Sequence, residues 1–180
     1  MAGKNKLARF AQIKTFKNVY EVGIYDIRQQ DFELKGRWRE DHFKNNNPIV
    51  LELGCGKGEY SVGLGRKYPD KNFIGVDIKG ARMFVGAKEA LDSGMNNVAF
   101  LRTRIDFIES MFAPEEVDEI WITFPDPQPQ ESRERKRLTS PRFLNRYLKF
   151  LKPGGIVHLK TDSQSLHEYT LSVIEEKKYQ

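Results

Sequence analysis

Residues 48–60 read PIVLELGCGKGEY, and this stretch decides the fold. The apolar run 49–53 is short and stops at glycines, which is typical of a buried strand. Gly54, Gly56 and Gly58 permit a tight turn and a close approach of a ligand to the backbone. A helical pattern follows over 58–69. We therefore predict a strand, a glycine turn and a helix in direct succession.

The alternation of short apolar runs and helical stretches continues along the chain. Strands alternating with helices form right-handed crossovers, and they build a doubly wound α/β domain with a mainly parallel sheet. The predicted sheet either is complete with five strands or continues in strands that this sequence lacks after Gln180. The further strands are predicted over 72–78, 97–103, 116–124 and 156–161, and the further helices over 80–95, 140–155 and 163–179.

The composition indicates a folded domain with a real core. The chain has 180 residues, 39% of them hydrophobic, and a formal net charge of +5, which permits an anionic partner such as nucleic acid without requiring one. Residues 1–47 mix basic and aromatic side chains, so we predict a basic N-terminal extension to a domain over 48–180. The extension orders on RNA, packs on the domain as a helix, or frays.

Few residues are suited to disulfide or metal chemistry. Cys55 is the single cysteine of the sequence, which excludes an internal disulfide and a cysteine-built zinc site. The three histidines share no metal-ligand spacing, and no apolar run approaches the ~20 residues of a membrane span. We therefore expect a cytoplasmic protein without a metal site.

Two acids flank the glycine turn in the predicted sheet. Asp77 ends the second predicted strand, where doubly wound sheets place an acid that binds ribose hydroxyls; a helix N-cap is the alternative. Glu52 lies in an apolar strand, where an unpaired acid is costly to bury, so we expect a cationic ligand as its partner. The pattern E-x-G-x-G-x-G with a later acid resembles the S-adenosylmethionine site of class I methyltransferases.

A third acid, Asp126, lies between two prolines after the fourth predicted strand. Pro127 disfavours helical geometry at Asp126, so the sequence predicts an acid presented at the strand end, beside the site of Glu52 and Asp77. A solvated turn is the alternative. The run ESRERKRL follows, and it is either a phosphate-binding surface or a solvated helix face.

The block FPDP, the basic run ending KRL and the later HLKTD resemble the bacterial tRNA (guanine-N7)-methyltransferase family, as do PIVLELGCGKGEY and GVDIKGARM. The resemblance covers most of the chain. It implies a Rossmann-like class I fold, a tRNA partner, and transfer of a methyl group from S-adenosylmethionine to N7 of guanine 46 in the variable loop. The residues it implies are Asp126 for catalysis; Glu52, Gly54, Gly56, Gly58, Asp77, Arg104, Asp106 and Asp126 for the cofactor; and Asp162, Arg133 and Arg135 for the substrate.

The sequence departs from the family pattern in three places. The family acid after the third strand aligns with Arg104, and Asp106 follows two residues on, so one of these two contacts the adenine. Gln128 and Gln130 replace the Trp and Lys of the family block DPWPK, so Arg133 or Arg135 takes the place of the substrate lysine. The family's C-terminal Thr-x-x-Glu element has no counterpart before the last residue.

Other functions remain open at this stage. An amino-group methyltransferase acting on adenine or glutamine is disfavoured, because Asp126-Pro127-Gln128 lacks the aromatic residue of that motif. An RNA-binding protein that binds the cofactor without catalysis is favoured by the departures from the family pattern. A nicotinamide oxidoreductase fits least, because Glu52 would repel a pyrophosphate.

Overall fold

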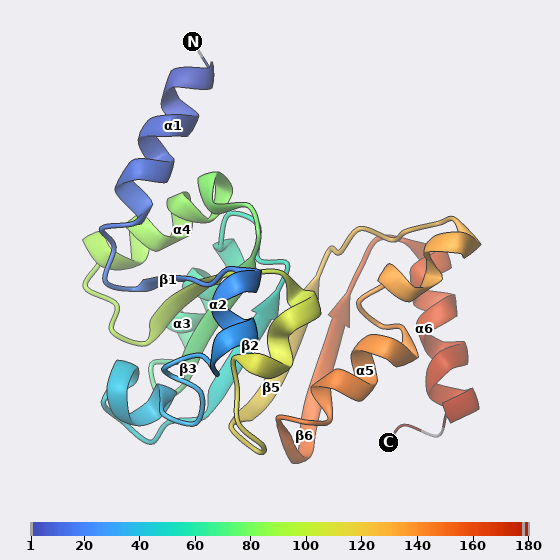
Figure 1. The fold of residues 1–180 in the computed structure, drawn as a ribbon. Coiled ribbons are helices and arrows are strands. Elements are labelled where there is room, and N and C mark those ends of the chain that lie inside the picture. Colours follow the sequence, from blue (N-terminus) through green and yellow to red (C-terminus); the bar gives the residue numbers. More distant parts are fainter. Residues whose placement is uncertain (1, 178, 180) are drawn as a thin grey trace.

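The computed structural model describes residues 2–177 and Tyr179; Met1, Lys178 and Gln180 lie outside it. Parallel strands form one sheet in the order β1-β4-β3-β2-β5-β6 (Figure 1). This confirms the predicted parallel α/β fold. The strands are β1 (Val19–Glu21), β2 (Ile49–Leu53), β3 (Asn72–Asp77), β4 (Val98–Arg102), β5 (Val117–Thr123) and β6 (Leu151–Lys160).

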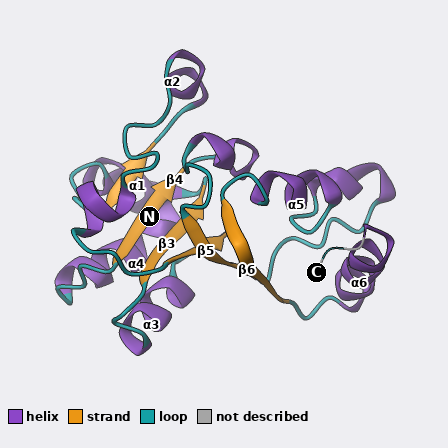
Figure 2. Ribbon diagram, turned by 90° about the horizontal axis from the view of Figure 1, so that it is seen from below, coloured by secondary structure: helices purple, strands orange, loops and turns teal. Residues whose placement is uncertain are grey.

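Helices cover both faces of the sheet (Figure 2), because the central strands are apolar on both sides. In β2, Val50 packs in one apolar cluster, and Ile49, Leu51 and Leu53 pack in the other. The helices on the Val50 face are α1 (Ala2–Ile13), α3 (Glu59–Lys67) and α4 (Gly80–Asp92). The other cluster takes in residues of the π-helix η1 (Trp38–Phe43), the 3-10 helix η2 (Ile105–Ser110) and α5 (Pro141–Tyr147).

Residues before β2 contribute an edge strand and buried side chains to this core. β1 pairs with β4 at the edge of the sheet, with Val19 opposite Phe100. Trp38 is fully buried, and its ring N–H donates to the Met111 carbonyl at 3.1 Å. Helix α1 packs against α4. Of the alternatives for this segment, the structure has a helix packed on the domain, together with an edge strand. The short helix α2 (Ile24–Gln29) follows β1.

The C-terminal part differs from its prediction at one boundary. The helix predicted over 140–155 ends at Tyr147, and β6 begins at Leu151 instead of Ile156. A register shift between Val117 and Glu119 of β5 accommodates the extra residues of β6. The 3-10 helix η3 (Glu131–Lys136) precedes α5, and α6 (Gln164–Lys177) follows β6. Among the described helices, none has the length and apolar character needed to cross a membrane.

Candidate active site

The candidate site lies where the carboxyl ends of the parallel strands meet. The chain runs from β2 outward to β3 and β4, and then returns to place β5 on the other side of β2. Ligands of doubly wound sheets bind at such a reversal of strand order. The loops that follow β2, β3, β4, β5 and β6 therefore supply the candidate residues.

The turn after β2 has the backbone geometry that its glycines predict. Gly54, Gly56 and Gly58 have φ angles of 78°, 56° and 77°, a left-handed region that glycine adopts without steric cost. The N–H groups of Gly54 and Cys55 both donate to the Val76 carbonyl, at 2.8 and 3.0 Å. These bonds tie the turn to the end of β3.

Asp77, at the end of β3, lies beside this turn. Its Oδ2 accepts the Gly56 N–H at 2.9 Å, and its Oδ1 accepts the Lys79 N–H at 2.8 Å. Asp77 is partly exposed. A carboxylate offers about four acceptor positions, so each oxygen keeps a position for a ligand hydroxyl. The alternative role of Asp77 as the N-cap of the next helix is met only in part. The N-cap of α4 is Lys79, and Asp77 accepts the backbone N–H of that residue.

Glu52 is buried, with 4% of its surface exposed, and protein groups supply its partners. Its Oε2 accepts the N–H and the hydroxyl of Ser61, at 2.8 and 2.6 Å, and its Oε1 accepts the Thr123 hydroxyl at 2.8 Å. Burial raises the pKa of Glu52, and these hydrogen bonds offset only part of that rise. The carboxylate therefore joins β2 to the first turn of α3 and to the end of β5, where the sequence led us to expect a cationic ligand.

Asp126 is exposed in the loop after β5. Its Oδ1 accepts the Gln128 N–H at 3.1 Å, and no other described group hydrogen-bonds its carboxylate. The residues that precede Pro125 and Pro129, Phe124 and Gln128, have φ angles of 46° and 45°. Left-handed geometry is uncommon outside glycine, so the backbone on both sides of Asp126 is strained.

The loop after β4 places its two candidates differently. Asp106 Oδ1 accepts Arg142 Nη2 of α5 at 2.9 Å, and the Asp106 carbonyl accepts a bond from Arg146. Arg104 Nη2 lies 3.5 Å from Asp106 Oδ2, and the Arg104 side chain is largely exposed. An ion pair with Arg142 and a backbone hydrogen bond from Arg146 thus hold Asp106 and η2 against α5.

The substrate candidates lie in the segments that follow β5 and β6. Asp162 follows β6, is exposed, and has no hydrogen-bond partner among the described residues. Arg133 and Arg135 of η3 are exposed and form no ion pair with a described carboxylate. Arg137 differs, because its Nε donates to the Gln128 carbonyl at 3.1 Å and its guanidinium lies 4.2 Å from the Tyr169 ring centre. Arg137 therefore fastens the loop to α6.

Comparison with known proteins identifies the family. A family model described as "Putative methyltransferase" matches residues 46–180. A tRNA (guanine-N(7)-)-methyltransferase of Christiangramia forsetii is 58% identical over 97% of this chain and 78% of its own length. The enzyme of that name from Bacteroides fragilis is 57% identical over 97% of this chain and 68% of its own. The chain belongs to the tRNA (guanine-N(7)-)-methyltransferase family.

Solved structures agree with a methyltransferase fold. The aminoglycoside resistance methyltransferase NpmB1 matches 82% of this chain and 70% of its own, with a TM-score of 0.59 and 17% identity. The antibiotic-resistance methyltransferase Kmr matches 68% of this chain and 64% of its own, with a TM-score of 0.54 and 20% identity. At these identities the likeness concerns the fold alone.

Sequence reasoning gave no substrate role to two aromatic residues of this methyltransferase, Tyr60 and Phe124. The rings of Tyr60 and Phe124 lie 6.4 Å apart between centres. Lys160 Nζ lies 5.2 Å from the Tyr60 centre and 5.5 Å from the Phe124 centre. The sequence did carry a signal for Phe124, because a bulky aromatic residue there directly precedes Pro125-Asp126-Pro127.

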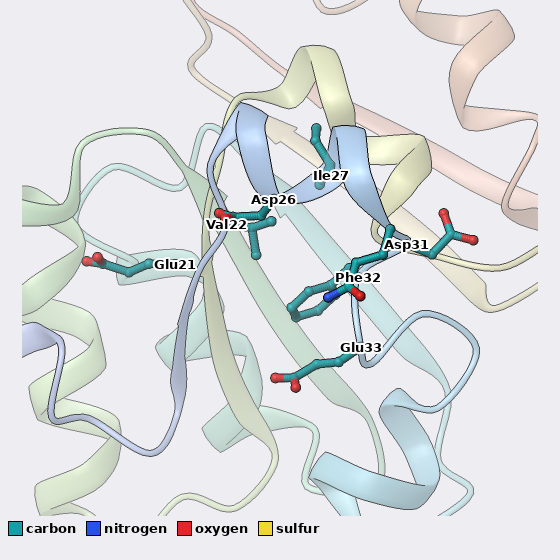
Figure 3. A pocket seen from close by; sticks show the side chains of 8 residues that line it. Glu21, Val22, Asp26, Ile27, Asp31, Phe32 and Glu33 are labelled. Atoms are coloured by element: carbon teal, nitrogen blue, oxygen red, sulfur yellow. The ribbon is translucent and has the colours of Figure 1, made fainter.

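A hollow of about 130 Å³ lies elsewhere on the methyltransferase domain (Figure 3). It is formed by β1, α2 and the segment after them, and its lining carries acidic side chains. These carboxylates would repel the phosphates of a nucleic acid. None of the lining residues belongs to the candidate site. The hollow is therefore separate from the site built on β2, β3 and β5. Its lining residues are Glu21, Val22, Asp26, Ile27, Gln30, Asp31, Phe32 and Glu33.

Proposed function

We propose that the chain transfers a methyl group from S-adenosylmethionine to N7 of guanine 46 in the variable loop of tRNA. One observation carries the proposal: in a chain of this methyltransferase family, Asp77 binds the glycine turn at the strand-order reversal, and Asp126 follows β5, the strand on the other side of β2. The relatives' names support tRNA and guanine N7. The resemblance of the sequence motifs supports the cofactor and position 46.

The residues of the turn fit the cofactor. Asp77 keeps acceptor positions for the two ribose hydroxyls, and the left-handed turn at Gly56 is held by that same carboxylate. A Cβ atom on Gly54 would meet no described atom within 4 Å, so the space beside the turn is open to a ligand. When bound, the cofactor supplies the methyl group in activated form, on a sulfonium sulfur.

Asp126 supplies the electrostatic part of the mechanism. N7 of guanine has an in-plane lone pair and no proton, so no general base is needed. The guanine ring becomes positively charged when N7 is methylated, and a fixed carboxylate near the ring stabilises that charge. Asp126 is exposed and lightly hydrogen-bonded, so its charge is available. Asp162 holds the guanine edge by accepting its N–H groups, and Arg133 and Arg135 contact phosphates.

The first experiment measures transfer of labelled methyl from S-adenosylmethionine to an unmodified tRNA transcript, followed by mapping of the modified base. We expect label on guanine 46 at N7. Label at another base would refute the assigned position. Cofactor binding without any transfer would favour the alternative, an RNA-binding protein that no longer catalyses, which the absence of the block lysine at Gln130 supports.

The role of Asp126 has its own test. We expect Asp126→Ala to lower kcat by about 100-fold, the loss typical of one electrostatic group, with an unchanged melting temperature. Asp70→Ala is the matched control, because Asp70 also follows a proline and is exposed in a turn, before β3. Near-normal turnover in Asp126→Ala would remove the electrostatic role.

A further inference from the structure

An exposed aromatic ring, Phe124, and a half-buried one, Tyr60, lie beside the candidate site. Phe124 is 52% exposed, although phenylalanine is among the residues most often buried. Its ring lies 6.4 Å from that of Tyr60, in the first turn of α3, with the two planes tilted by 56°. Asp126, the proposed catalytic residue, is two positions further along the same loop. The rings and the carboxylate therefore share one rim.

Phe124 is held in an unfavourable conformation. Its φ is 46°, which is a genuine outlier for a bulky residue, and it precedes a proline, which restricts it further. Its N–H donates to the Lys160 carbonyl at 2.8 Å, which fixes the strained peptide to β6. Such strain persists where the surrounding structure imposes it, and it gathers at ligand sites. Burial does not explain it, because the ring remains exposed.

Glu52 sets the spacing of the two rings. Its carboxylate hydrogen-bonds Ser61, which directly follows Tyr60, and Thr123, which directly precedes Phe124. One buried group thus ties the neighbour of Tyr60 to the neighbour of Phe124. Glu52 acts here as a positioning residue, since its carboxylate is buried beneath the rim.

The Phe124 ring is open to solvent and the Tyr60 ring is partly so, which leaves room for a planar ligand. The described group that lies over both is the Lys160 ammonium, at 5.2 and 5.5 Å from the ring centres. Lys160 is exposed and carried on a flexible stem. A cation on a flexible stem can move aside, and every nucleobase has a π-face that stacks on aromatic side chains.

We propose that Phe124 and Tyr60 form a stacking platform that receives the target guanine of the RNA and delivers it to Asp126. The proposal rests on the proposed function for the identity of the base. It adds two residues that bind the substrate, and it gives Glu52 the role of holding these two residues in position. Stacking on Phe124 orients the ring plane, and Asp126, on the same loop, then lies near the ring that acquires charge.

The test uses an unmodified tRNA transcript and a second transcript that carries 2-aminopurine at position 46, whose fluorescence is quenched on stacking. We expect Phe124→Ala to weaken binding of the transcript by about 5- to 150-fold and to abolish the quenching. Phe124→Tyr should restore both. Tyr68→Ala is the matched control, because Tyr68 is an exposed aromatic residue near lysines at the other end of α3, and it should change neither.

Binding of S-adenosylmethionine should be the same in all four proteins, which excludes a general loss of the site or of the fold. Unchanged RNA affinity and quenching in Phe124→Ala, with methyl transfer intact in the wild type, would overturn the platform and leave the proposed function standing. Quenching that depends on Phe124 in a wild-type protein without methyl transfer would refute the proposed function and support the platform.

Discussion

Replacement of Gly86 by alanine tests whether α4 supports the glycine turn. A glycine inside a helix costs roughly 0.5–1 kcal/mol relative to alanine, so Gly86→Ala would ordinarily stabilise the protein. Here the new Cβ would lie 2.5 Å from the Lys57 carbonyl oxygen and 3.0 Å from the Gly58 Cα, both of them backbone atoms. Ordinary contact begins at 3.4 Å, so the turn must move by about 0.9 Å or the helix must shift.

Overpacking of this kind costs typically 1–3 kcal/mol, which exceeds the gain in helix propensity. We expect a net loss of about 0.5–2 kcal/mol, or a fall in melting temperature of about 1–8 °C for a domain of this size. Because the displaced backbone belongs to the turn, affinity for S-adenosylmethionine should also fall, by about 10-fold or more.

Gly63→Ala is the matched control for this change. Gly63 lies in α3, and a Cβ there would meet no described atom within 4 Å. It should raise the melting temperature by about 1–4 °C and leave cofactor affinity unchanged. Thermal melts and calorimetric titration measure both quantities. If Gly86→Ala stabilises the protein as Gly63→Ala does, or melts earlier with normal cofactor affinity, the argument about the turn is wrong.

Two further predictions concern pH and salt. Burial, and secondarily the charge of Lys44, lowers the pKa of His42 to about 4 from 6.5, so between these pH values the unfolded chain binds a proton that the folded chain does not. The free energy of unfolding should therefore fall by about 3 kcal/mol as pH drops through this window. Urea unfolding at pH 4 to 7 measures this fall, and His42→Asn should reduce it. An equal pH dependence of the unfolding free energy in both proteins would contradict the prediction. Replacing Arg133 and Arg135 by glutamine should reduce the slope of log affinity for tRNA against log salt by ~1 for each phosphate that the protein no longer neutralises, and an unchanged slope would identify η3 as a solvated face.

Much of the fold is visible in the sequence because its strands are short apolar runs that end at glycine, proline or acid. β2, which stops at Gly54, and β3, which ends at Asp77, follow this rule most clearly. β1 does not. Its three residues, Val19–Glu21, lie in a charged segment, and their pairing partner is β4, which is far along the chain. The predicted C-terminal boundary of the helix over 140–155 was also wrong. Leu151 pairs with Val117 of β5, so β6 begins there.

The candidate site was predicted in its parts but not in its contacts. Glycine spacing and acids at strand ends placed Gly54, Gly56 and Asp77 at one edge of the sheet. The partners of Glu52 could not be predicted, because Ser61 and Thr123 reach it from a helix and a distant strand. Asp106 is similar, since its arginine partners lie on α5. Hydrogen bonds between elements depend on tertiary packing, and a single sequence does not encode them as a local pattern.

The edge position of β1 has a consequence for biosynthesis. Val19 leaves the ribosome first but pairs with Phe100, which is added 81 positions later. At about 5–20 residues per second, the N-terminal segment waits roughly 4–16 s for its partner strand. Trp38 waits almost as long, because Met111, whose carbonyl accepts its ring N–H, is added 73 positions later, and the ring of Phe112 follows directly. The nascent chain therefore carries an unburied tryptophan until β4, η2 and the residues directly after them have emerged, and the fluorescence of Trp38 would report the moment at which this earlier-made segment docks.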